Sequence, residues 1–458
     1  MRRCTIRDPT TQSRTLGARN RCYESERRKV DRLTRSPLQA ASQEPIPTLF
    51  DDVQAPGATR GGALSPKRPA VEKAGLADVF PYYAGFSFEW ACNQLMRWEA
   101  SGVVLDPWNG SGTTTLAAQH LGFQSIGVDR NPVANVIARL RSDAGRCTGD
   151  IKRPPKPRTR DTERFRRDPL AAWFDAEAIA RIRDWHRVIK KLDVDLYTIG
   201  MVALFRAVRS LTKSFEGSNP TWVKRAKEES SLIYLDYSEV DLAVEREIYF
   251  VSSRAAEHPK YSAPITLIGG DSSALPIADE RIDVVLTSPP YLTRIDYAVA
   301  YTRELAILGI DISSDRRLRS GLMGTTLIRR EDSLDLSALG GAGKSLLERI
   351  AQHDSKASSG YYLKQARQYL DDLTAGFDQL NRVCKRKATV HLVIQDSFYK
   401  DVPVPLAEIC IEESRARGWD LELQERFEVR RSLTALNTAA RAYKKGDVEE
   451  SVITLRRG

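Results

Sequence analysis

Cysteine is scarce: the chain has six cysteines, and they are scattered along the sequence. None belongs to a Cys-x-x-Cys pair, so the sequence offers no zinc ribbon and no redox-active dithiol. No cysteine follows a proline, and none lies between Cys147 and Cys384. Isolated cysteines in a large chain are typical of a reduced compartment, and we therefore expect a cytoplasmic protein.

Long apolar runs and clustered histidines are also missing. No stretch approaches the roughly 20 apolar residues that a membrane span requires. No apolar segment follows Met1-Arg2-Arg3, so the sequence does not predict secretion. The five histidines show no metal-ligand spacing, and we predict no metal site.

Positive charge is in excess. Lys and Arg number 70 against 60 Asp and Glu, which gives a formal net charge of +10 over 458 residues. This surplus suits a polyanionic partner, although many cationic proteins bind none. Residues 1–75 lack apolar periodicity and are rich in Arg, Pro, Gly and Ser, which predicts a disordered basic tail.

The chain then alternates between short apolar runs and helical patterns. Val103–Leu105 and Ser125–Val128 are typical of buried strands, and Thr113–His120 and Pro132–Arg141 of helices. This alternation predicts the opening of a parallel α/β sheet.

Two insertions interrupt the alternation. Residues 146–262 look largely helical and begin with the basic segment Lys152–Arg167; residues 311–360 are Gly-rich and predict a mobile loop. Strand patterns return between these insertions and after the second one. The predicted organisation is a tail over 1–75, a first sheet part over 76–145, a helical insertion over 146–262, a catalytic part over 263–310, a flexible insertion over 311–360 and a C-terminal part over 361–458.

The first motif, Asp106-Pro107-Trp108-Asn109-Gly110-Ser111-Gly112-Thr113-Thr114, joins a predicted strand to a predicted helix. Glycines allow the backbone to approach a ligand closely, and a helix start offers free N–H groups. Asp129 ends the next strand, where an acid can accept hydrogen bonds from both ribose hydroxyls. The motif lacks Gly-Lys-Ser/Thr and the Gly-x-Gly-x-x-Gly spacing, which disfavours a P-loop and a dinucleotide site.

The second motif, Thr287-Ser288-Pro289-Pro290-Tyr291, directly follows the predicted strand Ile282–Leu286. Two successive prolines hold the backbone extended and carry no N–H, so this turn presents hydrogen-bond acceptors. Acceptors that grip the hydrogens of a conjugated amino group can draw its nitrogen toward tetrahedral geometry. Tyr291 can stack on the ring that carries the amino group.

Together these motifs resemble those of the amino-methyltransferases of DNA, with Ser-Pro-Pro-Tyr in the form more common among cytosine-N4 enzymes. The resemblance implies an α/β, Rossmann-like S-adenosylmethionine-dependent methyltransferase sheet with a largely helical insertion. It implies S-adenosyl-L-methionine as cofactor, double-stranded DNA as partner and catalysis by Ser288-Pro289-Pro290-Tyr291. Whether a restriction endonuclease accompanies the enzyme stays open.

The resemblance also assigns cofactor-binding residues. Phe86 and Ser87, in Tyr83-Ala84-Gly85-Phe86-Ser87, match the upstream segment that contacts the methionine moiety. The remaining expected cofactor contacts are Asp106, Pro107, Gly110 and Gly112 in the first motif, Asp129 at the ribose, and Asp271 and Ser272 at the adenine.

Several readings compete with cytosine-N4 methylation. Methylation of cytosine at carbon 5 needs a cysteine nucleophile, and the cysteine positions exclude it. Adenine-N6 methylation of DNA remains as the main alternative, although those enzymes more often carry Asp or Asn before Pro-Pro. An RNA guanine methyltransferase, a protein-glutamine methyltransferase and a catalytically silent nucleic-acid-binding protein are less compatible with intact Ser288-Pro289-Pro290-Tyr291.

The position of the insertions matches none of the usual arrangements of this family. We expect residues 146–262 and 311–360 to embrace DNA. The basic segment Lys152–Arg167 is either a phosphate-contacting element or a solvated linker.

Overall fold

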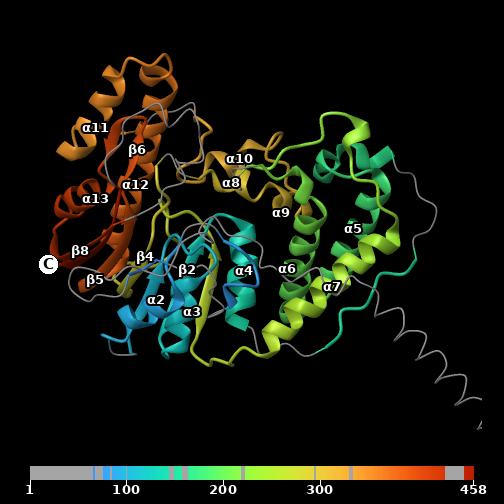
Figure 1. Ribbon diagram of the computed structural model, residues 1–458. Coiled ribbons are helices and arrows are strands. Elements are labelled where there is room, and N and C mark those ends of the chain that lie inside the picture. The colour runs from blue at the N-terminus through green and yellow to red at the C-terminus, as the bar shows by residue number, and fades with distance from the viewer. Residues whose placement is uncertain are drawn as a thin grey trace, which may run out of the picture. The chain divides into compact units, whose positions relative to one another are not determined.

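The computed structural model describes residues 65–67, 76–82, 85–98, 101–143, 149–156, 163–217, 222–292, 295–329, 334–428 and 448–458 (Figure 1). All of them lie within one compact unit, residues 48–458. The tail predicted over residues 1–75 lies outside the described residues except for 65–67, and Tyr83, Ala84 and Cys147 lie outside them too. In the described part of the chain, no helix is both long and apolar enough to cross a membrane.

Seven of the described strands form one sheet in the order β3-β2-β1-β4-β5-β9-β8. The first five of these run parallel to their neighbours, and β9 is antiparallel to both β5 and β8. The strands are β1 (Val103–Asp106), β2 (Gln124–Asp129), β3 (Ile265–Gly269), β4 (Ile282–Thr287), β5 (Cys384–Gln395), β8 (Trp419–Glu428) and β9 (Glu449–Arg457), with a separate ribbon of β6 (Ser397–Tyr399) and β7 (Val402–Val404).

This sheet confirms the predicted Rossmann-like α/β fold, and the insertion over 146–262 is largely helical, as predicted. Strand order reverses between β1 and β4, and such a switch point opens a crevice at the carboxyl ends of the strands. The central strands carry apolar runs because both faces of the sheet are covered by helices; β4, for example, is buried at five of its six residues.

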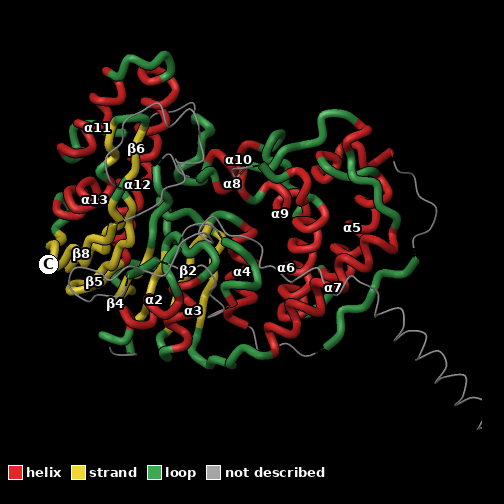
Figure 2. The backbone as a smooth tube through the Cα atoms, in the orientation of Figure 1, coloured by secondary structure: helices red, strands yellow, loops and turns green. Residues whose placement is uncertain are grey.

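The helices are α2 (Phe88–Leu95), α3 (Thr113–His120), α4 (Pro132–Asp143), α5 (Ala176–Ile189), α6 (Val194–Leu211), α7 (Tyr237–Ala256), α8 (Tyr297–Ala300), α9 (Thr302–Ile307), α10 (Arg316–Ser320), α11 (Gly341–Gln352), α12 (Leu363–Val383) and α13 (Leu406–Arg415). Figure 2 shows the strands gathered on one side and the helical insertion on the other. The predicted strands and helices over 103–141 are confirmed with small shifts of their ends.

The insertion consists of α5, α6 and α7 and shares its core with the sheet domain. One apolar cluster joins Val202 and Phe205 of α6 to Val133 and Ile137 of α4 and to Leu305 of α9. The insertion is therefore fixed to the sheet through α6, whereas α5 lies beyond α6 from the sheet (Figure 1).

Buried ion pairs stiffen this insertion. The Arg181 guanidinium donates to both carboxylate oxygens of Asp241 at 2.6 and 2.7 Å, and Trp185 Nε1 donates to the same carboxylate at 2.7 Å. Arg209 of α6 pairs with Glu304 of α9, and both side chains are buried. Paired in this way, the buried charges hold α6 and α9 in one relative position.

The Gly-rich stretch 311–360, predicted as a mobile loop, instead holds the helices α10 and α11. Gly341 and Gly343 lie inside α11. The helix forms in spite of them because Leu346, Leu347 and Ile350 pack into the core formed with α12.

Candidate active site

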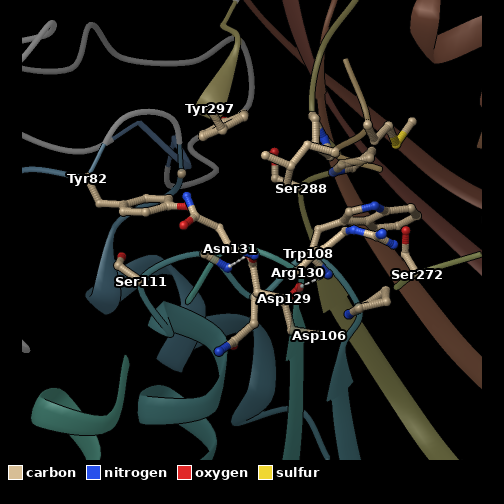
Figure 3. Close-up of a pocket in the computed structure, with 18 of the residues that line it drawn as sticks. Tyr82, Asp106, Trp108, Ser111, Asp129, Arg130, Asn131, Ser272, Ser288 and Tyr297 are labelled. Atoms are coloured by element: carbon tan, nitrogen blue, oxygen red, sulfur yellow. Dashed lines mark hydrogen bonds between the residues drawn. The ribbon is translucent and has the colours of Figure 1, made fainter. Parts of the chain in front are cut away.

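A cleft opens at the carboxyl ends of β1, β2, β3 and β4 and contains about 890 Å³ of empty space, including the part open to solvent. Figure 3 shows Ser288 and Tyr297 on one side of it and Asp106 and Asp129 on the other. Its lining residues are Tyr82, Gly85, Phe86, Asp106–Ser111, Thr113, Asp129–Asn131, Gly270–Ser272, Ser288–Tyr291, Tyr297 and Gly321–Met323.

Asp106 joins the two motifs from below. Its carboxylate accepts hydrogen bonds from Thr287 Oγ1 at 2.6 Å, from Thr114 Oγ1 at 2.7 Å and from the backbone N–H of Trp108 at 3.1 Å. Burial raises the pKa of Asp106 to about 6, although these three donors oppose the shift. Asp106 thus fixes the distance between the glycine-containing turn and the Ser-Pro-Pro-Tyr turn.

Asp129 holds the turn at Gly110. One of its carboxylate oxygens accepts from the Gly110 N–H at 2.8 Å, and the other accepts from the Asn131 N–H at 2.7 Å. Burial raises the pKa of Asp129 to about 6. Gly110 has φ +49°, and a Cβ at this position would lie 2.9 Å from the Tyr82 ring. Both the backbone conformation and the close approach therefore require glycine.

The Ser288-Pro289-Pro290-Tyr291 turn is held from behind. Tyr369 of α12 donates its hydroxyl to the Pro290 carbonyl at 2.8 Å, and Ser288 and Tyr291 share a hydrogen bond of 3.0 Å between their hydroxyls. Ser288 and Tyr291 both line the cleft, so these hydroxyls lie at its wall.

Aromatic side chains form a further wall of the cleft. Tyr82 stacks on Tyr301 with ring centroids 4.9 Å apart and an interplanar angle of 14°, and on Tyr297 at 6.1 Å and 21°. Burial raises the pKa of Tyr297, so its hydroxyl is neutral at physiological pH. The wall is flat and uncharged, which suits a planar ring.

At the far end of the cleft, Asp271 follows β3. One of its carboxylate oxygens accepts from Ser273 N and Oγ at 3.0 and 2.8 Å, and the other pairs with Arg130. Trp108 also lines this end, and a Cβ on Gly376 of α12 would lie 2.9 Å from its indole ring. The end of the cleft therefore combines an acid, a hydroxyl and a large flat ring.

Most of the residues predicted for the site meet in this one cleft: Phe86, Asp106, Pro107, Gly110, Asp129, Asp271, Ser272, Ser288, Pro289, Pro290 and Tyr291 all line it. Ser87 and Gly112 lie outside the lining set. The Ser87 hydroxyl accepts from Trp90 N and caps α2, and Gly112, with φ +80°, caps α3 and packs on Ala138.

Sequence reasoning missed several lining residues. Asn109 and Asn131 lie next to or close to predicted site residues in the sequence, so proximity to those residues could have identified them. Tyr82, Tyr297 and Gly321–Met323 come from segments distant in sequence, and no local pattern indicates them.

The cleft fits an adenosine-bearing sulfonium cofactor. Trp108 Nε1, Asn109 Nδ2 and Asn131 Nδ2 are buried and have no hydrogen-bond partner among the described residues. Buried donors without partners are costly, but Asn109 Nδ2 packs against Gly127 of β2 and does not point into the cleft. The groups that suit this cofactor are the acids Asp129 and Asp271, which line the cleft and can accept from ribose hydroxyls and an adenine amino group.

No protein family model matches the sequence. The chain is 24% identical to the type II methyltransferase M.AvaI of Nostoc sp. in an alignment that covers 56% of this chain and 58% of that protein. It is 25% identical to the type II methyltransferase M.BsoBI of Geobacillus stearothermophilus in an alignment that covers 71% of this chain and 75% of that protein. The match thus spans less than two thirds of M.AvaI and three quarters of M.BsoBI.

Among solved structures, a SAM-dependent methyltransferase from Methanosarcina mazei aligns with 79% of this chain and 94% of its own, at 9% identity and a TM-score of 0.27. The rRNA methyltransferase aviRa from Streptomyces viridochromogenes aligns over 82% and 87%, at 12% identity and a TM-score of 0.26. TM-scores this low do not bear on function. The chain is similar in sequence to two type II methyltransferases, and its mostly parallel sheet has a cleft at the carboxyl ends of its strands.

Proposed function

We propose that the chain is a DNA methyltransferase that transfers a methyl group from S-adenosyl-L-methionine to the exocyclic amino group of a flipped base, with cytosine N4 favoured. The observation that carries this proposal is the shared cleft. Asp106 and Asp129 lie on one side of it and Ser288 on the other, and Gly110 and Pro289-Pro290-Tyr291 line it as well. The similarity to the type II methyltransferases M.AvaI and M.BsoBI supports DNA as the substrate class.

Each of the predicted cofactor-binding residues would contact a different part of the cofactor. Asp129 would accept from the ribose hydroxyls, Asp271 from the adenine amino group, and Phe86 and Gly110 would border the methionine moiety. The cofactor supplies an electrophilic methyl group on a sulfonium that leaves readily. Asp106 would position the two turns rather than contact the cofactor, because its carboxylate already accepts hydrogen bonds from Thr114, Thr287 and the Trp108 N–H.

Ser288 and the backbone carbonyls of its turn would act on the amino group of the base. They would accept hydrogen bonds from its two N–H groups, draw the nitrogen toward tetrahedral geometry and direct its lone pair at the methyl donor. As the nitrogen–methyl bond forms, the methyl–sulfur bond breaks and the nitrogen loses one proton to water. The amino group of a stacked base is unreachable inside a duplex, so the base must leave the helix. Tyr291 would stack on it, and Tyr297 and Tyr82 also line the cleft.

The choice of base rests on Ser288. The serine form of the motif favours cytosine N4, and adenine N6 is the alternative. A direct experiment is to incubate the protein with methyl-labelled cofactor and duplex DNA, digest the DNA to nucleosides and identify the modified base by mass. N4-methylcytosine supports the proposal in full. N6-methyladenine supports methylation of an amino group of DNA but not the choice of cytosine, and label in neither base contradicts the proposal.

Cofactor affinity should depend on pH through Asp129. Its pKa is raised to about 6, so the carboxylate is charged at pH 7 and becomes protonated as the pH falls through 6. A protonated Asp129 accepts hydrogen bonds poorly, and we expect the Kd for the cofactor to rise by up to about tenfold per pH unit below 6. Calorimetric titrations between pH 5 and 8 measure this dependence.

The variant Asp129→Asn serves as the control for that titration. It should bind the cofactor weakly at every pH and lose most of the slope below pH 6. A wild-type Kd that stays constant from pH 8 to 5 contradicts the role given to Asp129.

Residues 146–262 and 311–360 are the proposed DNA-embracing parts. In the basic segment Lys152–Arg167, Arg153 pairs with Glu245 at 2.5 Å and Arg166 with Glu163 at 3.1 Å. Part of the charge of this segment is therefore neutralised within the protein. Arg158 and Arg160 lie outside the described residues.

A further inference from the structure

The segment Arg316–Thr326 is anchored beside the catalytic turn by a single buried carboxylate. Asp296 Oδ2 accepts from Arg319 Nη2 at 2.9 Å, from Thr326 Oγ1 at 2.8 Å and from Thr326 N at 3.0 Å. Its Oδ1 accepts from Val299 N at the start of α8. Asp296 follows the Ser-Pro-Pro-Tyr turn by only a few residues, so this anchor ties the segment to the catalytic loop.

The middle of the same segment reaches into the cleft. Gly321, Leu322 and Met323 line it directly after α10 ends. Gly321 has no room for a Cβ, because the Arg130 guanidinium occupies that space. A Cβ on Gly324 would lie 3.6 Å from the Tyr291 carbonyl oxygen. The segment therefore closes the cleft on the side where Tyr291 stands.

The outer face of this segment carries positive charge. Arg316 is exposed and has no ion-pair partner among the described residues. The Arg317 side chain is 91% exposed, and among the described residues its ion pair is a local one with Asp315 at 3.2 Å. Such an exposed pair is weak and gives way to a stronger anion. Arg319 differs from both, because its guanidinium is bound to the Asp296 carboxylate.

A second element extends this charge. Arg225 donates to Ser313 Oγ at 3.3 Å and lies 4.0 Å from Asp311, which places the loop after α6 next to α10. That loop is held to the insertion by backbone bonds, with Lys224 N donating to the Phe215 carbonyl at 2.9 Å. It exposes Lys213, Trp222 and Lys224. Together Lys213, Lys224, Arg225, Arg316 and Arg317 form what we call the basic rim.

We infer that the basic rim binds the phosphate backbone of DNA next to the extruded nucleotide, with Arg316 and Arg317 as its central contacts, while Gly321–Met323 walls the base pocket. This inference rests on the proposed function and goes beyond it by assigning the surface. Arginine forks suit phosphate oxygens, and phosphate contacts fix a protein on the duplex. Because α10 leads directly into the pocket wall, gripping the backbone there would present the neighbouring base to Ser288.

The test is the salt dependence of DNA binding by the double variant Arg316→Ala/Arg317→Ala. Fluorescence anisotropy with a labelled random-sequence duplex should show the slope of log K against log salt reduced by about 1 to 2, since each lost phosphate contact removes about 0.9. The Kd for the cofactor, measured by calorimetry, should not change. An unchanged salt slope overturns the inference, and so does tighter binding of the wild type to an RNA duplex than to DNA.

A matched control removes two exposed arginines at the opposite edge of the sheet. Arg281 and Arg386 lie at the amino ends of β4 and β5, away from the cleft. The variant Arg281→Ala/Arg386→Ala should keep the wild-type salt slope; an equal reduction would show a general charge effect and overturn the assignment. If the wild type binds neither cofactor nor DNA, the proposed function fails. If it binds both and the rim variant keeps its slope, only the rim assignment fails.

Discussion

Replacing Ser288 with alanine should lower the rate of methyl transfer by about 10²- to 10³-fold, the range found when one preorganised polar group is removed from a reacting centre. Ser288 lines the cleft, and the one hydrogen bond recorded for its side chain joins its hydroxyl to that of Tyr291. Its loss should therefore leave the glycine-containing turn intact. Single-turnover rates with labelled cofactor measure the effect on chemistry.

Cofactor binding separates this role from a structural one. Because neither Gly110 nor Asp129 makes a recorded hydrogen bond to the Ser288 side chain, the Kd of the cofactor should stay within about twofold of the wild-type value. Ser253→Ala on the exposed face of α7 is a suitable control, since its hydroxyl only returns to the Tyr249 carbonyl of the same helix. A Ser288→Ala protein that loses cofactor binding and keeps a high residual rate contradicts the proposed role.

The sheet could be predicted from local sequence because each central strand is short, apolar and followed by a turn signal. Val103–Leu105 leads into Gly110, and Ser125–Val128 leads into Asp129, which accepts from the Asn131 N–H just before α4 begins. In a parallel sheet these strand ends must meet at one edge, which is why Gly110 and Ser288 could be placed in one cleft without a structure.

The pocket wall could not be predicted, because it depends on contacts between distant segments. Tyr82 meets Tyr297 only after α8 is placed, and α8 is capped by Asp296, whose carboxylate also binds Thr326. The stretch 311–360 was misjudged for a related reason. Glycine inside a helix costs about 1 kcal/mol relative to alanine, and in α11 the burial of Leu346 and Ile350 offsets that cost.

Asp106 shows a different gap between motif and structure. Its position in the motif indicates a cofactor contact, and it does line the cleft. Its carboxylate nevertheless spends its hydrogen bonds on Thr114, Thr287 and the Trp108 N–H. A motif identifies a residue as important, but only the surrounding contacts show whether it acts on the ligand or on the walls of the site.

The two glycines of the first motif should respond very differently to alanine. At Gly112, φ is +80°, and a Cβ would lie 2.8 Å from the Ala138 Cβ and 3.2 Å from the Ala138 Cα. The second of these atoms belongs to the backbone of α4, which cannot move without disturbing the core. Left-handed strain and overpacking together should lower the free energy of unfolding by about 2–4 kcal/mol in Gly112→Ala. Denaturant titration with an unchanged m-value measures the loss.

Gly110→Ala should damage binding more than folding. Its φ of +49° makes strain modest, about 1–2 kcal/mol, and its Cβ would meet the Tyr82 ring at 2.9 Å. Tyr82 lines the cleft, so the ring can relieve the clash only by moving into the space beside the turn. Cofactor affinity should fall by at least about 30-fold, which corresponds to about 2 kcal/mol. Folded Gly112→Ala should bind the cofactor within a few-fold of wild type, because Gly112 lies behind the lining; the reverse pattern in the two variants would place the cofactor elsewhere than against Gly110.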